Sequence, residues 1–405
     1  QSSIASIVVT INSPPTPGVY SATPSFGIEL STQFTLLAYL WQDNDLPLCY
    51  KFDYVSSAGN TVSLASKSER SYTTTTLPAL IKNKGYTLIA TVVTVYDALN
   101  TGTNASAKVR VKSDPFDPVV GVKLYDLLQS SLNTSTGDER ATQRLIGVFG
   151  AVLNSVNCTL APNCSALQRN ECSTVSHTCG SCYTNYTGVY GSSNTNCVSV
   201  STQQQSARRA LYYTEQALVA GNTCTVSSDC SNAFAECVNS ECAVPDKTCP
   251  TSVVEEVCSG HGSCIFVNSN SNNVISACAV DDPNCEARCV CSAAHSSISN
   301  GTQDYSGFYH GSACDVTEEL YQANIKSRFL LFQAFANSSA LSDISAEVIA
   351  SWANTLAALA QGTDEINADS VTQMLNLFHL AMYSAEIVEA SEYNVAPALQ
   401  AISSF

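Results

Sequence analysis

Closely spaced cysteines and carboxylates are the residues of this chain whose types and spacing could do chemistry. Cys179 and Cys182 stand in a Cys-Gly-Ser-Cys run, which has the Cys-x-x-Cys spacing of redox dithiols. Catalysis of thiol–disulfide exchange also requires a thioredoxin-like strand–helix–strand fold around the two cysteines. This pair lies in a Cys-dense stretch without that pattern. We therefore interpret both cysteines as partners in structural disulfides.

Metal-binding and catalytic patterns give little further support for an enzyme. Asp43, Asn44 and Asp45 offer oxygen ligands to a cation, but they are too few for a complete site and also suit a turn between strands. Oxidised cysteines cannot ligate zinc, and the histidines are not at ligand spacings. They are His177, His261, His295, His310 and His379. We predict no enzyme, no catalytic residue, no metal and no cofactor, because no nucleophile elbow, His-Glu-x-x-His or phosphate loop occurs.

The cysteines indicate an oxidising compartment. All of the 19 cysteines except Cys49 lie between residues 158 and 314, and thiol buffers would keep such pairs reduced in a cytosol. Asn-x-Ser/Thr sequons agree with a secreted or cell-surface location. They stand at Asn104, Asn133, Asn157, Asn163, Asn185, Asn300 and Asn337. We expect N-linked glycans there, and segments 13–18 and 71–76 offer hydroxyls that could carry O-linked glycans.

Charge and hydropathy exclude two classes of partner. The chain carries 18 basic and 34 acidic side chains, a formal charge of −16, so it has no basic footprint for nucleic acid. It contains no apolar run of about 18 residues, the length that spans a membrane. Neither a signal peptide nor an initiator Met precedes Gln1, and we interpret the sequence as a processed or partial chain.

The first 115 residues predict a β-sandwich of the immunoglobulin or fibronectin-III kind. Segments rich in β-branched and aromatic residues alternate with turn signals. The segments are 34–41, 49–55, 86–97 and 107–112. Segment 86–97 is apolar on both faces, which predicts a central strand.

This part resembles the REJ (receptor for egg jelly) module of polycystins and sperm receptors. The shared pattern is Trp-x-Asp-x-Asp-x-Pro-Leu-x-Tyr-x-Phe, then Leu-Pro, then a strand ending in Val-x-Asp. The matching residues are Trp41, Asp43, Asp45, Pro47, Leu48, Tyr50, Phe52, Leu77, Pro78 and Asp97. The resemblance implies that the last sandwich-like portion of such a module is present.

The middle of the chain resembles small disulfide-stapled modules. Residues 158–200 are similar to a Cys-rich unit of large surface or flagellar-hair (mastigoneme) glycoproteins of algae and protists, and 249–315 resemble an EGF-like module. The EGF resemblance implies the pairs Cys249–Cys264, Cys258–Cys289 and Cys291–Cys314, and we pair Cys278 with Cys285 in an insertion. The calcium signature of some EGF modules is missing before Cys249, so we predict no calcium site there.

Periodic apolar residues predict helices on both sides of the cysteines. Residues 119–157 form one helical stretch, with Ile146, Phe149, Leu153 and Val156 on one face. Stripes that include Phe332, Trp352 and Leu375 predict a three-helix bundle over 316–405. This bundle resembles the helical half of a GPCR-autoproteolysis-inducing domain, although Ala381 after His379-Leu380 departs from the cleavage motif.

Taken together, the patterns predict a multidomain, disulfide-rich α+β protein. The expected segments are 1–115 (β-sandwich), 116–157 (linker and helices), 158–200 (Cys-rich module), 201–248 (spacer helix and four-Cys knot), 249–315 (EGF-like module) and 316–405 (helical bundle).

Cys49 is left over once the other cysteines pair. Two interpretations stay open: a buried free thiol, or a bond to another chain or to a missing part of this one.

Two functions from different classes fit this organisation. The first is an extracellular structural glycoprotein that assembles with copies of itself, or with related surface glycoproteins, into a filament, hair or matrix. The alternative is the ligand-binding ectodomain of a polycystin-like or adhesion-type receptor.

Overall fold

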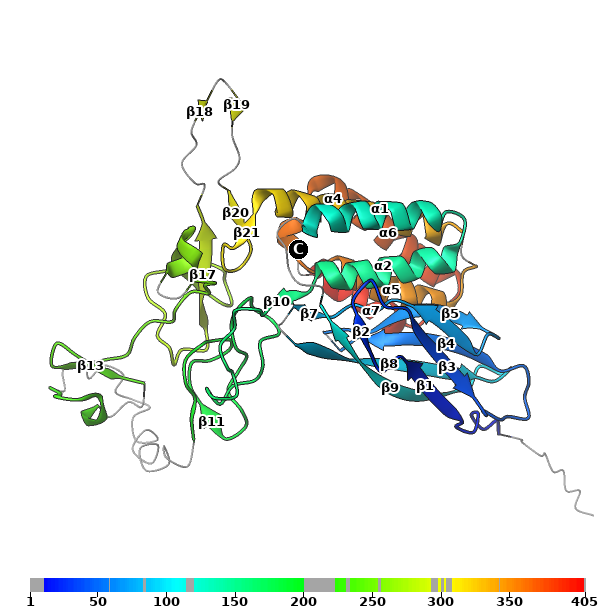
Figure 1. Ribbon diagram of the computed structural model, residues 1–405, viewed down its shortest axis with the longest axis horizontal. Coiled ribbons are helices and arrows are strands. Elements are labelled where there is room, and N and C mark those ends of the chain that lie inside the picture. The colour runs from blue at the N-terminus through cyan, green and yellow to red at the C-terminus, as the bar shows by residue number, and fades with distance from the viewer. Residues whose placement is uncertain are drawn as a thin grey trace, which may run out of the picture. The chain divides into compact units, whose positions relative to one another are not determined.

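The computed structural model describes most of the chain as two compact units (Figure 1). The described ranges are 11–57, 59–82, 85–113, 120–199, 223–230, 234–253, 256–292, 298–299, 302–303, 308–341 and 343–403. The sandwich–helix unit is built from residues within 1–80, 84–155 and 323–405, and the cysteine-rich unit from 81–83 and 156–322. All but the first residue of the predicted linker 113–118, and the predicted spacer helix 202–221, lie outside the described residues.

The larger sheet of the sandwich has five strands. Its order is β2 (Phe26–Ile28), β9 (Gly102–Lys112), β8 (Tyr86–Tyr96), β4 (Cys49–Val55) and β5 (Thr61–Ser68). The predicted strand 86–97 lies at the centre of this sheet as β8. Strand β9 begins earlier than the predicted 107–112. Residues 102–106 continue its ladder with β8, and small residues such as Ala105 take the inward positions there.

A three-stranded sheet covers the inner face of the larger one. Its order is β1 (Val19–Thr23), β3 (Phe34–Tyr39) and β6 (Tyr72–Thr75). Alternate residues of both sheets, among them Phe34, Leu36, Phe52, Ile89 and Val93, are buried in one core. Every second residue of these strands thus points between the two sheets and forms the core of the predicted sandwich.

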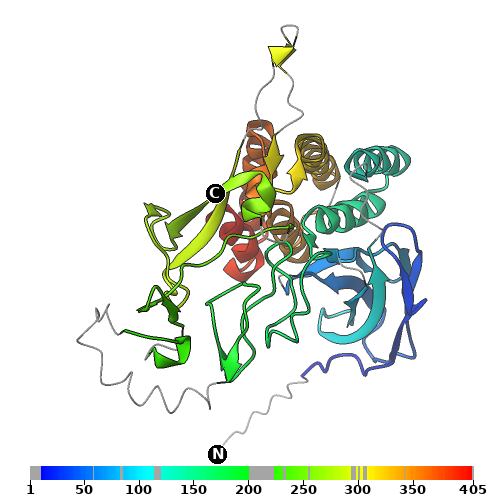
Figure 2. The same ribbon diagram turned by 60° about the vertical axis from the view of Figure 1, so that its left-hand side comes forward.

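The helices before and after the cysteines share a second core. They are α1 (Val120–Thr134), α2 (Glu139–Leu153), α4 (Glu318–Ser339), α5 (Ala346–Leu359), α6 (Ala368–Ile387) and α7 (Glu392–Ser403). Leu128 and Phe149 from the first pair pack in one cluster with Phe332, Trp352 and Leu377. Figure 2 shows the two teal helices beside the orange-brown C-terminal ones, above the blue sandwich strands.

Helix α2 joins the two cores through residues without side chains. A Cβ on Gly147 would lie 2.9 Å from Cγ1 of Val62 in β5, and one on Gly150 would lie 3.1 Å from Cδ2 of Leu359 in α5. The hydroxyl of Tyr54 donates a 2.9 Å hydrogen bond to the carbonyl of Gly147. Glycine therefore lets α2 approach a strand on one side and a helix on the other.

The cysteine-rich unit has short ladders and little apolar core. Its longest ladder pairs β15 (Gly262–Asn268) with β16 (Val274–Ile275) and β17 (Cys285–Cys291). The other pairs are β7 (Ile81–Lys82) with β10 (Val156–Asn157), β11 (Tyr186–Thr187) with β12 (Val198–Ser199), β13 (Glu236–Val238) with β14 (Glu241–Ala243), β18 (Ile298–Ser299) with β19 (Thr302–Gln303), and β20 (Tyr309–His310) with β21 (Val316–Thr317). Disulfides rather than apolar burial stabilise a unit of this kind.

Several predicted helix faces differ from those in the structure. The C-terminal part has four helices rather than three, because α7 follows the predicted third helix. Val156 lies in strand β10, not on a helix. In α6, Met374 and Leu377 are buried while Leu375 is exposed. The predicted stripe was wrong at Leu375, whereas Phe378 and Met382 of the same stripe pack against buried clusters. Helix α6 carries apolar residues on more than one face, so periodicity alone does not choose the buried one.

A buried arginine ties α4 to the helices around it. Arg328 is 1% exposed, and its Nε donates to Oε2 of Glu365 at 2.8 Å. Its Nη1 donates to Oδ1 of Asn154 at 2.9 Å and to the carbonyl of Leu359 at 3.3 Å. One side chain thus satisfies acceptors from three segments.

Replacing this arginine should destabilise the helical core. We expect Arg328→Ala to lower the free energy of unfolding by roughly 3–5 kcal/mol, because Glu365 and Asn154 lose their buried partner. As a control, Glu347→Gln breaks the more exposed 3.5 Å pair with Lys67 and should cost about 0–1 kcal/mol. Chemical denaturation followed by helical circular dichroism measures both, and equal losses would contradict this role of Arg328.

Candidate functional site

The open face of the five-stranded sheet carries exposed aromatic and aliphatic side chains beside a row of basic ones. We name it the sheet face. Its members are Phe26, Ile28, Tyr86, Leu88, Lys108, Arg110 and Lys112. Cross-strand register puts Leu88 opposite Arg110 and Tyr86 opposite Lys112, so these side chains leave the same side of the sheet.

The apolar part of the sheet face is open to solvent. Phe26 is 49% and Leu88 is 55% exposed, and the rings of Phe26 and Tyr86 meet edge to face with centroids 5.0 Å apart. Lys108, Arg110 and Lys112 form no ion pair with any described residue. Exposed apolar area rimmed by charge is typical of a protein-binding surface.

A second open face lies at the end of helix α6. We name it the helix face. It consists of Leu380, Tyr383, Glu386, Ile387 and Glu389. Leu380, Tyr383 and Ile387 follow one another at helical spacing, and the last two are 58% and 57% exposed. Both carboxylates are exposed, so this face is apolar and acidic where the sheet face is apolar and basic.

Nine disulfides join the described cysteines of the middle region. The four pairs of the EGF-like part are Cys249–Cys264, Cys258–Cys289, Cys291–Cys314 and Cys278–Cys285, the same pairs as in the sequence prediction. The others are Cys158–Cys172, Cys164–Cys179, Cys182–Cys197, Cys224–Cys237 and Cys230–Cys242. Cys179 and Cys182 bond to different partners, so they do not form a redox pair with each other.

Cys49 is unpaired within the chain and half-buried. It leaves the same side of β4 as Lys51 and Asp53, and Asp53 is buried. Burial raises the pKa of Asp53, while Lys51 at 3.3 Å opposes that shift. The side of β4 that carries Cys49 therefore includes a buried residue, and alternation along the strand does not tell whether the thiol is accessible to another chain. Both interpretations of Cys49 stay predictions.

The predicted aspartates gather with a third one from another strand end. Single carboxylate oxygens of Asp43, Asp45 and Asp97 lie within 4.8 Å of one another. Asp97 already accepts hydrogen bonds from Asn12 at 2.6 Å and from the N–H groups of Leu99 and Thr101. Asp43 accepts from the N–H of Asp45. These contacts support the turn interpretation, in which the carboxylates order loops at one end of the sandwich.

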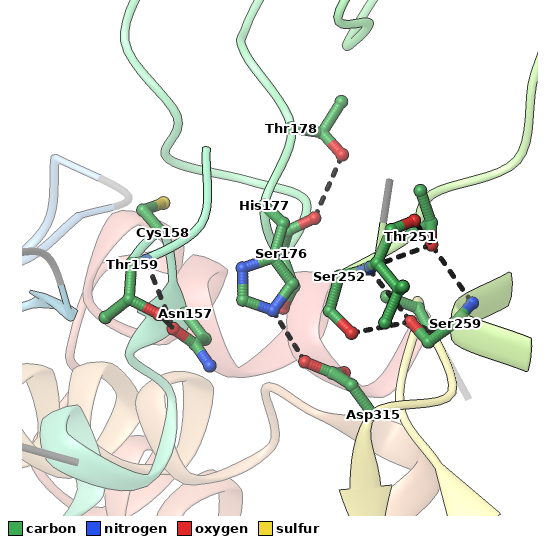
Figure 3. A network of polar contacts seen from close by, with 12 residues as sticks. Asn157, Cys158, Thr159, Ser176, His177, Thr178, Thr251, Ser252, Ser259 and Asp315 are labelled. Carbon is green, nitrogen blue, oxygen red and sulfur yellow. Dashed lines mark hydrogen bonds and ion pairs between the residues drawn. The ribbon is translucent and has the colours of Figure 1, made fainter. Parts of the chain in front are cut away.

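A buried histidine–aspartate pair lies in the cysteine-rich unit (Figure 3). Nε2 of His177 lies 2.6 Å from Oδ2 of Asp315, and His177 is 1% exposed. This pair could not be predicted from sequence patterns, because the two residues are 138 positions apart in the chain. Its position, together with the buried hydroxyl of Ser259 nearby, invites comparison with a catalytic triad.

The contacts do not complete a triad. The hydroxyl of Ser259 donates to the carbonyl of Ala313 at 2.7 Å and accepts hydrogen bonds from the N–H and hydroxyl of Ser252. Nδ1 of His177 is buried and has no hydrogen bond to a described residue. Without a serine on the free nitrogen, the pair acts as a structural link between the loops around His177 and Asp315.

Most predicted glycan acceptors are accessible. Asn104, Asn133, Asn163, Asn185 and Asn337 are exposed, Asn157 is partly exposed, and Asn300 lies outside the described residues. Asn104 leaves the same face of β9 as Lys108, so a glycan on it would border the sheet face. Their occupancy stays a prediction.

Comparison with known proteins identifies the N-terminal part. The family model of the REJ domain matches residues 1–146. This part of the chain is REJ-like. The match runs past residue 115 into α2, whereas the sequence predicted that helix in a separate segment of linker and helices, 116–157. The packing of α2 on β5 gives the physical reason, because α2 contributes Val148 to the sandwich core.

Other comparisons add nothing to the REJ assignment. A search of curated proteins found no match. The PKD1 domain of Vibrio anguillarum Epp has 14% identity and a TM-score of 0.18, over 26% of this chain and 100% of that one. A carbohydrate-binding module of the β-sandwich superfamily has 16% identity and a TM-score of 0.20, over 27% of this chain and 38% of that one. At such scores neither likeness carries an argument.

The REJ domain and the disulfides fit an extracellular protein. REJ domains are non-catalytic extracellular modules. No described helix is long and apolar enough to cross a membrane.

The carboxylate of Asp97 should make stability depend on pH. Burial would raise its pKa, but hydrogen bonds from Asn12, Thr101 and Leu99 lower it overall. A lowered pKa stabilises the fold above the unfolded-state pKa of about 3.9, and this contribution disappears as the pH falls through the folded-state value. We expect Asp97→Asn to unfold more easily at neutral pH, with a difference from wild type that shrinks in acid. Thermal unfolding in EDTA checks this, and a loss that is equal at all pH values would contradict it.

A peptide map under non-reducing conditions tests the cysteine assignments. We expect the nine pairs above, and Cys49 either as a free thiol or in a peptide linked to another chain. A linked peptide that disappears on reduction together with a dimer band would establish the intermolecular bond. Recovery of Cys49 only as a free thiol would exclude it, and a Cys179–Cys182 pair would contradict the disulfide assignment.

Proposed function

We propose that this chain is a segment of an extracellular structural glycoprotein that assembles with copies of itself into a cell-surface filament, hair or matrix. The observation that carries the proposal is the presence of two different open faces on one compact unit. The sheet face is apolar and basic and the helix face is apolar and acidic. Complementary charge beside apolar area favours association of one face with the other.

The difference between the faces determines the kind of assembly. A contact between unlike faces is heterologous, so each bound copy leaves one sheet face and one helix face open. Repetition of such a contact gives a ring if the rotation closes and an open fibre if it does not. The chain's excess of acidic side chains would keep separate copies apart elsewhere on their surfaces.

The disulfides and glycans suit the same role. Cross-linked modules resist unfolding outside the cell without a large apolar core. Glycans on the exposed sequons other than Asn104, which borders the sheet face, would cover surface away from the contacts and keep the assembly soluble. Flagellar hairs of algae and protists are one setting for such a protein, which we infer only from the sequence resemblance of residues 158–200.

The alternative is the ligand-binding ectodomain of a polycystin-like or adhesion-type receptor. The REJ match over residues 1–146 favours it. In that case the two open faces would bind other chains or a ligand rather than further copies. Electron microscopy of unreduced material from its source separates the two, because a regular axial repeat supports assembly and separate particles support the receptor.

Charge reversal on each face tests the assembly directly. We expect a sheet-face variant (Lys108→Glu with Arg110→Glu) and a helix-face variant (Glu386→Lys with Glu389→Lys) each to weaken self-association by roughly tenfold or more, because the two faces then carry the same sign. A mixture of the two variants should associate again, since every sheet face then meets a helix face of opposite charge. Sedimentation velocity and negative-stain microscopy provide the measurement.

Lys326→Glu supplies the matched control, because Lys326 is exposed and lies outside both faces. It should associate like wild type. Variants that assemble normally when alone, or a mixture that stays monomeric while wild type assembles, would contradict the proposed pairing. Wild-type protein that is monomeric at every concentration would favour the receptor.

A further inference from the structure

Three arginines converge on one small cavity of the sandwich–helix unit. The cavity has a volume of about 220 Å³ and is lined by Arg70, Arg140 and Arg144. Arg70 follows β5, while Arg140 and Arg144 lie one turn apart on α2. The close packing of α2 on the sandwich therefore brings together cations that are far apart in the sequence.

Positive charge gathers at this cavity although the chain as a whole is acidic. It has 18 basic against 34 acidic side chains, yet none of the three arginines forms an ion pair with a described residue. Asp138 is the one acidic residue in the lining, so the cavity keeps a formal excess of positive charge. Guanidinium groups left without carboxylates in an acidic protein point to an anionic ligand.

Neighbouring residues hold two of the arginines in place. The guanidinium carbon of Arg70 lies 5.6 Å from the ring centroid of Tyr72, within range of a cation–π contact. Nη1 of Arg144 donates to the carbonyl of Thr74 at 3.0 Å. Both side chains are therefore partly ordered before a ligand arrives, which lowers the entropy that binding loses.

The remaining lining suits a ligand with hydroxyl groups. Ser66, Ser68 and Thr73 bring hydroxyls that donate and accept, and Asp138 is an acceptor that also caps α2 through its Oδ1. An inorganic anion or an acidic peptide side chain has no series of hydroxyl groups that could donate to Asp138 and to the serine and threonine oxygens. A sugar acid does, because its carboxylate stands next to ring hydroxyls.

A second cavity adjoins the first and extends its polar lining. It has a volume of about 390 Å³ and shares Asp138 and Arg144 with the smaller one. Ser131, Thr134 and Ser135 line it. Because they share Asp138 and Arg144, the two cavities lie side by side, and we name them together the groove.

We propose that this groove binds a carboxylated sugar, such as a uronate residue of an acidic polysaccharide. The carboxylate would lie among Arg70, Arg140 and Arg144, with bidentate hydrogen bonds from a guanidinium fork. The ring hydroxyls would meet Asp138 and the serine and threonine hydroxyls. This activity goes beyond self-assembly, because it uses residues outside the sheet face and the helix face.

Titration calorimetry of the full chain with galacturonate oligomers tests the proposal. We expect saturable binding that weakens as salt rises, and a loss of about tenfold or more in affinity for Arg70→Ala with Arg140→Ala, which removes two charge-assisted contacts. Both side chains are exposed, so the thermal unfolding of the variant should match that of wild type. A neutral galactose oligomer of the same length should not bind.

Lys326→Ala is the matched control, because it removes one exposed cation outside the groove and outside both faces and should leave uronate binding unchanged. Equal affinity of wild type and the double variant would overturn the site. Stronger binding of dextran sulfate or polyglutamate than of the uronate oligomers would overturn the ligand class. A charge-reversed sheet face that abolishes assembly but still binds uronate would show that the two functions are independent.

Discussion

The close packing of α2 against β5 is the constraint on which the sandwich–helix unit depends. Gly147 leaves room for Val62, Gly150 leaves room for Leu359, and the hydroxyl of Tyr54 satisfies the carbonyl of Gly147. A larger residue at either glycine would force its neighbour to shift, because the added Cβ would lie only 2.9 Å from Val62 or 3.1 Å from Leu359. Because α2 belongs to both cores, the sandwich and the C-terminal helices form one unit although the cysteine-rich region separates them in the sequence.

Two physical strategies stabilise the two units. The sandwich–helix unit buries aromatic and aliphatic side chains in two large clusters, so its stability comes from the hydrophobic effect and from buried polar links such as Arg328 with Glu365. The cysteine-rich unit has short ladders, and its cross-links limit the freedom of the unfolded chain instead. A protein outside the cell can combine both, since oxidising conditions maintain the cross-links.

The unit that carries the REJ match also carries the features that favour binding. The sheet face and the helix face differ in sign, which would give an assembly direction, and the arginine-lined groove lies apart from both. An acidic chain that assembles through a few basic residues avoids non-specific contact elsewhere, because most of its surface repels other copies. A uronate site on the same unit would link such an assembly to an acidic polysaccharide, so that one unit serves cohesion and attachment.

The sequence by itself determined the local features of this protein. Runs of β-branched and aromatic residues predicted β4 and β8, the tryptophan–aspartate–proline pattern carried the resemblance to a REJ module, and the resemblance to EGF modules implied three pairs of that region. Each of these depends on neighbours within a few dozen residues. Only the tertiary structure decided that α1 and α2 pack with the C-terminal helices, that Asp97 joins Asp43 and Asp45, and that Arg70 meets Arg140. Those groupings depend on which apolar face is buried against which, and α6 shows why the pattern cannot choose: Leu375 and Leu377 are equally apolar, yet only Leu377 has a core to enter.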